Sequence, residues 1–151
     1  MIRVTNTSSN TTFDVEVVRS AVCATLKAHD AEACEVSVLL TDDSDIRNLN
    51  RDYRKIDEPT DVLAFAMREG EDNSVNPNLL GDLVISLETA ARQAVTADEG
   101  LSGPSSSIET EVAMLTIHGA LHLLGYDHQT QDEATIMFEK QKAIFCLLQV
   151  P

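Results

Sequence analysis

Apolar residues in the first half of the chain alternate between helical spacing and strand-like runs. Between positions 14 and 28 they recur every three or four residues, which predicts an amphipathic helix: Val15, Val18, Val22 and Leu26. The short run IRV near the N-terminus and the β-rich run ACEVSVLLT predict strands over 1–5 and 33–41. After the second strand, Asp42, Asp43 or Ser44 can cap a helix that runs to about Tyr53.

The second half continues the same alternation. Pro59 bars a regular helix in the connection RKIDEPT, and the runs DVLAFAM (61–67) and LLGDLVISL (79–87) predict two more strands around a polar surface loop, 68–78. ETAARQAV begins a helix, and a second loop spans 97–107. Ser107 can cap a helix over about 108–124, which is apolar nearly all round, as a buried helix is. A last helix begins at Asp132, with one face made of Ala134, Met137, Phe138, Gln141, Ile144, Phe145 and Leu148.

This order of elements predicts an α+β fold, close to α/β in its alternation, with about four strands in a mixed sheet. The chain has 151 residues and no internal repeat or domain-sized linker, so we expect residues 1–151 to form a single domain. A chain of this length buries roughly two-thirds of its unfolded surface. The pairing order of the strands stays open at this point.

The composition is that of an ordinary globular protein, with 43% hydrophobic and 24% charged residues. No apolar run reaches the roughly 18 residues of a membrane span, and the N-terminus has no apolar signal core, so we expect a cytoplasmic protein. Cys23, Cys34 and Cys146 are scattered and form no CxxC pair. They are typical of small buried residues in a reduced protein, neither disulfides nor metal ligands.

The net charge of −14, with a pI near 4.4, argues against a nonspecific nucleic-acid binder, because phosphate contacts need cations. Four of the eleven basic residues nevertheless fall within nine positions: Arg47, Arg51, Arg54 and Lys55. Asp45, Asp52 and Asp57 are interleaved with them. From charge alone this cluster is interpreted as a solvated helix face.

Candidate chemistry is concentrated in HGALHLLGYDH, residues 118–128, which holds three of the four histidines. His118 and His122 lie one turn apart on a helix, and Gly125 can end that helix in a left-handed conformation. His128 can then approach the same point, giving three nitrogen ligands with one open position, as in a catalytic zinc site. The alternative is that these are three core histidines with satisfied hydrogen bonds. Each buried polar group that stays unpaired costs on the order of 1–3 kcal/mol, so this alternative needs a partner for every ring. The spacing favours metal binding.

The neighbours of these histidines leave several alternatives open. Gly119 stands where zinc peptidases of the H-E-x-x-H type carry a glutamate base, and its bare backbone indicates close approach of either a packed strand or a substrate. The Asp127 carboxylate can accept a hydrogen bond from a histidine ring N–H and so fix the tautomer, or it can accept a nearby backbone amide and stabilise a turn. Tyr126 is expected to serve packing, and His29 to be a surface residue unrelated to the site.

The full HGALHLLGYDH segment resembles the signature of the YbeY family, metal-dependent endoribonucleases of ribosomal RNA maturation. NRDYR at 50–54 is similar to the family's N-x-x-Y-R segment, PTDVLAFA at 59–66 to P-T-D-V-L-S-F-P, and LGDLVIS at 80–86 to L-G-D-I-V-I-S. Ala64 and Ala66 depart from the family's Ser and Pro. Loss of that proline allows the strand to continue further.

The resemblance implies a compact domain with a mixed four-stranded sheet and one zinc-like ion held by His118, His122 and His128. It implies cleavage of single-stranded RNA, processing of the 3′ end of small-subunit ribosomal RNA, and ribosome quality control. The ribosome or its proteins are the implied partners, and no membrane is involved. Arg54 matches the family's basic residue at the RNA cleft, so the resemblance makes it a catalytic candidate beside the histidines.

The expected chemistry is phosphodiester cleavage, in which a bound metal acts as a Lewis acid or lowers the pKa of water while Arg54 pairs with phosphate. No general base is assigned, and attack by water or by the RNA 2′-OH stays open. Imidazole ligands also accept nickel, copper or iron. Two other functions stay open: a zinc hydrolase of peptides or small amides, and a non-catalytic ribosome assembly factor stabilised by its metal.

Overall fold

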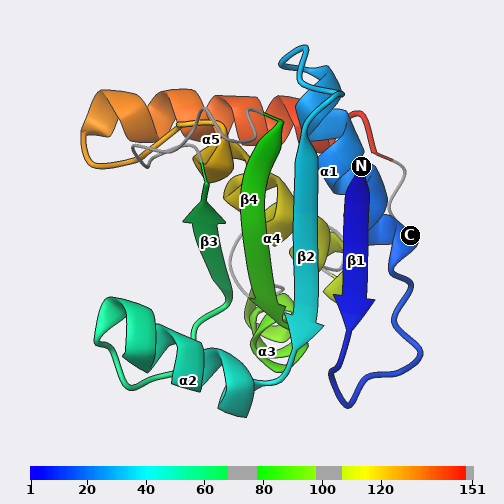
Figure 1. Ribbon diagram of the computed structural model, residues 1–151, viewed down its shortest axis with the longest axis vertical. Coiled ribbons are helices and arrows are strands. Elements are labelled where there is room, and N and C mark those ends of the chain that lie inside the picture. The colour runs from blue at the N-terminus through cyan, green and yellow to red at the C-terminus, as the bar shows by residue number, and fades with distance from the viewer. Residues whose placement is uncertain (68–77, 98–106, 149–151) are drawn as a thin grey trace.

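The computed structural model describes residues 1–67, 78–97 and 107–148, so most of both predicted loops lies outside the described residues. Each predicted helix and strand is present, with ends shifted by a few residues (Figure 1). The elements are β1 (Ile2–Asn6), α1 (Glu16–Lys27), β2 (Glu35–Thr41), α2 (Asp43–Arg54), β3 (Val62–Ala66), β4 (Leu79–Ser86), α3 (Leu87–Ala97), α4 (Ile108–Leu123) and α5 (Gln131–Phe145).

The four strands form one mixed sheet in the order β1-β2-β4-β3. β1, β2 and β4 are parallel, whereas β3 pairs antiparallel with β4 and forms an edge of the sheet. The predicted α+β class and mixed four-stranded sheet are therefore confirmed. Figure 1 shows α1 and α4 on one side of the sheet, while α2 lies on the opposite side, beside β3.

The core lies between the sheet and the two helices α1 and α4. Along β2, Val36, Val38 and Leu40 are buried, while Ser37 and Leu39 between them are half-buried toward the other face, as strand alternation requires. α4 packs against α1, α3, α5 and two strands, which explains why its sequence is apolar on nearly every side. None of the helices in the described ranges is long and apolar enough to cross a membrane.

Two expectations about burial are wrong. Phe138, predicted on the apolar face of α5, is 62% exposed, while its neighbour Met137 is buried. Consecutive helical residues point about 100° apart, and α5 buries only a narrow stripe against α4. The cysteines also differ from expectation, because only Cys34 is buried, Cys23 is half-buried and Cys146, just beyond α5, is exposed.

The helix caps follow the sequence in one case and depart from it in another. Ser107 precedes α4, and its hydroxyl accepts the Thr110 amide at 3.1 Å, as predicted. Asp42 occupies the N-cap position of α2, but its carboxylate accepts the Ser9 amide at 2.9 Å and does not cap the helix. The loop after β1 is thereby attached to the start of α2.

Asp43 joins α2 to β4 and α3. Its Oδ1 accepts the hydroxyls of Ser86 and Thr89, both at 2.6 Å, and its Oδ2 lies 2.9 Å from Arg92 Nη2. Burial raises the pKa of Asp43, but these hydrogen bonds and the Arg92 charge together outweigh burial and hold the pKa below its ordinary value. The ionised carboxylate therefore stabilises the folded state.

We expect Asp43→Asn to lower the free energy of unfolding at pH 7 by about 1 kcal/mol, because a charged acceptor of three bonds is lost. Since the folded pKa is lowered, this contribution is present above the unfolded pKa of about 3.9 and is lost as pH falls through the folded pKa. Urea unfolding of both proteins between pH 7 and 3 should show the difference shrinking below pH 4. A difference that stays constant with pH contradicts the assignment.

Candidate metal centre and its cleft

The end of α4 turns the chain back on itself, as the sequence predicts. α4 ends at Leu123, and Gly125 adopts φ +107°, in the region that favours glycine. The Gly125 amide donates to the His122 carbonyl and the Tyr126 amide to the Leu121 carbonyl, both at 3.0 Å. This turn returns residues 126–128 toward the last turn of the helix.

The turn brings the three predicted histidines together. One ring nitrogen from each of His118, His122 and His128 can be chosen so that all three lie within 4.8 Å of one another. The ring centroids are 4.8 Å apart for His118–His122, 5.2 Å for His122–His128 and 5.7 Å for His118–His128. Among the described residues, no cysteine or carboxylate joins this group. Three imidazoles without a fourth protein ligand suit a metal with an open coordination position.

His118 is oriented by a residue that the sequence analysis did not assign to the site. Its Nδ1 lies 3.1 Å from Gln141 Oε1 on α5. The amide oxygen only accepts, so Nδ1 carries the proton and Nε2 keeps its lone pair for a ligand. Gln141 stood out in the sequence as a polar residue within the apolar face of α5, and this interruption was the available signal.

The pKa of His122 lies below its ordinary value. Burial is the main cause, followed by the charges of His118 and His128, while Asp127 opposes the shift in part. The neutral imidazole is therefore favoured near neutral pH, and this is the form that ligates metals. The donor set thus fits a zinc-type ion in type and number of atoms.

Asp127 takes the turn role that the sequence allowed. Its Oδ1 accepts the His128 backbone amide at 2.7 Å, which fixes the residue that carries the third imidazole. In the described part of the chain, the side-chain hydrogen bond to a ring of the histidine group is made by Gln141. Support of a ring by Asp127 stays a prediction.

The expectation for His29 is wrong. His29 is half-buried at the end of α1, where its Nδ1 donates to the Thr25 carbonyl at 2.9 Å and its Nε2 accepts the Tyr126 hydroxyl at 3.0 Å. The two rings pack edge to face, with centroids 5.4 Å apart. The histidine outside the signature therefore anchors the signature turn to α1, across 97 positions that no sequence pattern links.

The histidines open onto a cleft of about 670 Å³ between β3, the end of α2 and the α4–α5 turn. Besides the histidines, its walls include Tyr53, Arg54, Asp61, Ala64, Phe65, Ala66, Gly119 and Asp127. The predicted catalytic candidate Arg54 thus lies in the same cleft as the three histidines. The cleft combines three side chains able to ligate a metal with a cationic side chain.

Arg54 differs from the other basic residues of its cluster. Arg47 pairs with Asp57 at 2.9 Å, Arg51 with Asp52 at 3.3 Å, and Lys55 donates to the Asp52 carbonyl. The described residues supply no carboxylate within ion-pair distance of Arg54. The interpretation as a solvated, internally paired face holds for these three neighbours, and Arg54 is left available for an anion.

The backbone of Gly119 is approached by the sheet. A β-carbon at this position would lie 2.7 Å from Leu83 Cδ2 and 3.4 Å from Val62 Cγ2. Leu83 is fully buried and has little room to move. Of the two alternatives left by the sequence, strand packing accounts for the glycine, although Gly119 also forms part of the cleft wall.

The two departures from the family's strand motif lie on the same wall. Ala66 is within β3 and pairs with Gly81, and the following Met67 amide still donates to the Leu80 carbonyl at 2.9 Å. The strand therefore continues through the position of the family's proline, as expected. Ala64 and Ala66 both line the cleft.

Comparison with known proteins gives consistent matches. The model of the family "Endoribonuclease YbeY" matches residues 3–149. Relatives named Endoribonuclease YbeY include one from Syntrophotalea carbinolica, 40% identical over 96% of this chain and 93% of its own length. Another, from Carboxydothermus hydrogenoformans, is 41% identical over 98% of this chain and 97% of its own. The solution structure of TM1509 from Thermotoga maritima superimposes with a TM-score of 0.66 at 27% identity, covering 96% of this chain and 87% of that one.

Proposed function

Since the chain belongs to the YbeY family of endoribonucleases, we propose that it cleaves single-stranded RNA with one zinc ion held by His118, His122 and His128. Its role is in ribosomal RNA processing, and we place its action at the 3′ end of small-subunit RNA and in ribosome quality control. The observation that carries this proposal is the cleft itself, in which three converging imidazoles and the available guanidinium of Arg54 face one space.

A bound zinc ion supplies Lewis-acid activation at an open coordination position. Residues around the three histidines determine how the imidazole rings are oriented. Gln141 orients the His118 ring, Asp127 fixes the backbone of His128, and the turn at Gly125 determines how far His128 reaches. Arg54 binds a phosphate oxygen and stabilises the negative charge that develops on it during cleavage.

The rest of the molecule limits how RNA arrives. With a net charge of −14, the chain as a whole repels a polyanion, so the Arg54 side of the cleft is the favourable approach. We propose that the cytoplasmic ribosome, or a basic ribosomal protein, presents the RNA strand to this cleft. The alternative of a peptide hydrolase is disfavoured because Gly119, packed on Leu83, occupies the position of the glutamate base.

The proposal is tested by assaying the zinc-loaded protein on single-stranded RNA, double-stranded RNA and a peptide mixture, with metal content measured in parallel. We expect about one zinc per chain and cleavage of single-stranded RNA alone. A 2′,3′-cyclic phosphate on the products indicates attack by the 2′-OH, and its absence indicates attack by water. Cleavage of peptides with intact RNA contradicts the proposal, and so does ribosome maturation in cells that depends on the protein but not on its metal.

Gln141 offers a test of the support behind the metal site. We expect Gln141→Leu to weaken zinc affinity about tenfold, because the His118 ring loses the acceptor that sets its tautomer. Gln141→Glu, which keeps an acceptor, should retain affinity. Competition with a chromophoric chelator measures both, and Gln131→Leu, exposed at the start of the same helix, is the control. Equal affinities for Gln141→Leu and the control contradict the role of Gln141.

A further inference from the structure

Tyr53 is a large aromatic residue that the fold leaves in solvent. It lies in the last turn of α2, immediately before Arg54, and is 67% exposed. Its ring contacts that of Phe65 on β3, with centroids 5.2 Å apart and planes at 68°. An edge-to-face contact of this kind leaves most of the Tyr53 ring free to contact another molecule. We name Tyr53 and Phe65 the aromatic pair.

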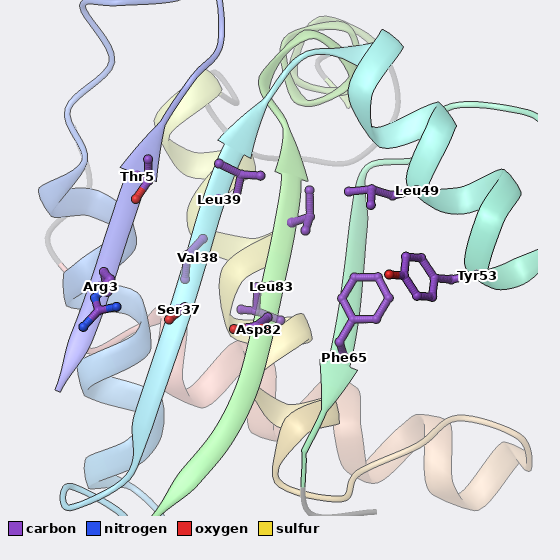
Figure 2. A pocket seen from close by; sticks show the side chains of 11 residues that line it. Arg3, Thr5, Ser37, Val38, Leu39, Leu49, Tyr53, Phe65, Asp82 and Leu83 are labelled. Carbon is purple, nitrogen blue, oxygen red and sulfur yellow. The ribbon is translucent and has the colours of Figure 1, made fainter.

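The aromatic pair is a wall shared by two hollows. One is the metal cleft, and the other is a hollow of about 530 Å³ on the sheet face that α1 and α4 do not cover. Figure 2 shows the second hollow, with the pair at its edge beside α2 and with Leu39, Leu49 and Asp82 further along it. The surface is thus continuous from the histidines to the open face of the sheet.

Strand alternation explains why the pair lies between the two hollows. Phe65 pairs with Asp82 and points to the open face, whereas Ala64 and Ala66 on either side of Phe65 point the other way and line the metal cleft. β3 is an edge strand, and within the described ranges no further strand lies beyond it to block the path from one face to the other. A chain that crosses this edge can place one group in the cleft and the next against the aromatic pair.

The geometry points to a base-binding subsite: we propose that one base of the RNA strand stacks on the aromatic pair while a neighbouring phosphate is bound by Arg54 in the metal cleft. This inference rests on the proposed function. Stacking on exposed aromatic rings is how many proteins hold single-stranded RNA, and it tolerates any base. A base inside a duplex is already paired and stacked, so the subsite selects single strands. Tyr53 and Arg54, adjacent in sequence, then recognise the base and the phosphate.

The first test uses steady-state cleavage of single-stranded RNA by the zinc-loaded protein. We expect Tyr53→Leu to raise KM about tenfold with a smaller change in kcat, and Tyr53→Phe to retain the wild-type KM, because stacking needs the ring and not the hydroxyl. Phe138→Leu, which removes an exposed aromatic residue in the middle of α5 that lines neither hollow, is the matched control and should leave KM unchanged. Thermal melting and zinc content verify that Tyr53→Leu, changed at an exposed position, keeps its fold and metal.

RNA substrates that lack one base separate stacking from a merely structural effect. For wild-type protein, removing the base beside the cleaved bond should raise KM as Tyr53→Leu does, and the two changes together should raise it little further. A purely structural role for Tyr53 makes the two effects independent, so that they multiply, and this result contradicts the subsite.

A spectroscopic test follows from the composition, because the chain has no tryptophan. Tyr53→Trp provides a single reporter, and its emission should be quenched when RNA is mixed in, before turnover, but less by the strand that lacks the base. If wild-type protein cleaves RNA and Tyr53→Leu has the same KM, the subsite is wrong while the proposed function stands. If wild-type protein leaves RNA intact, the proposed function fails, and the subsite fails with it.

Discussion

His122→Ala is expected to lose both the metal ion and the cleavage of RNA. His122 is the central member of the group, with ring centroids 4.8 and 5.2 Å from those of His118 and His128. The two histidines that remain, His118 and His128, should hold zinc far more weakly than all three together. Because the metal contributes several kcal/mol to the transition state, we expect RNA turnover to fall about a thousandfold or more, measured together with zinc content.

The control for His122→Ala is wild-type protein stripped of metal by a chelator. Both should be inactive, and both should melt below zinc-loaded wild type, since a metal that binds the folded state raises its stability. Added zinc should restore activity and melting temperature to the stripped wild type alone. A His122→Ala protein that retains one zinc per chain, or cleaves RNA at the wild-type rate, removes this histidine from the proposed site.

Arg54→Ala is expected to keep its zinc and lose RNA cleavage. The guanidinium lies outside the histidine group but in the same cleft, so its removal should leave metal binding unchanged. Loss of one cationic contact to developing charge reduces turnover by about a hundredfold. Arg54→Lys should recover part of the activity, because an ammonium restores the charge but not the planar, forked geometry.

Arg47→Ala is the matched control for Arg54→Ala. It removes the same side chain from the same helix, but Arg47 is engaged with Asp57 through two hydrogen bonds. We expect nearly wild-type cleavage from Arg47→Ala. If the two variants cleave RNA equally well, the contribution of Arg54 is no more than the general positive charge of α2, and its assigned role is wrong.

Much of the fold follows from local patterns. The apolar residues of α1 recur at helical spacing, and the run that forms β2 is rich in apolar β-formers, so local sequence alone located both elements. The histidine group was predictable for the same reason. His118 and His122 share a face within one helix, and the third ligand, His128, needs only the turn that Gly125 makes.

The support around the histidines was not predictable, because it depends on how distant elements pack. Gln141 reaches His118 only because α5 packs against α4, and His29 reaches Tyr126 only because α1 also packs against α4. Neither orientation can be read from spacing within one element. The aromatic pair has the same origin, since it requires α2 to lie beside the edge strand β3.

The contact of Gly119 with the sheet makes the geometry of the metal centre depend on the distance between α4 and the sheet. Gly119 lies between His118 and His122, and no side chain separates that turn of α4 from the fully buried Leu83. Any larger residue at position 119 would push this turn of α4 away from the sheet and move the imidazoles of His118 and His122 together. His128 belongs to the loop after the helix and would not move with them. The distance between α4 and β4 therefore determines where His118 and His122 lie relative to His128.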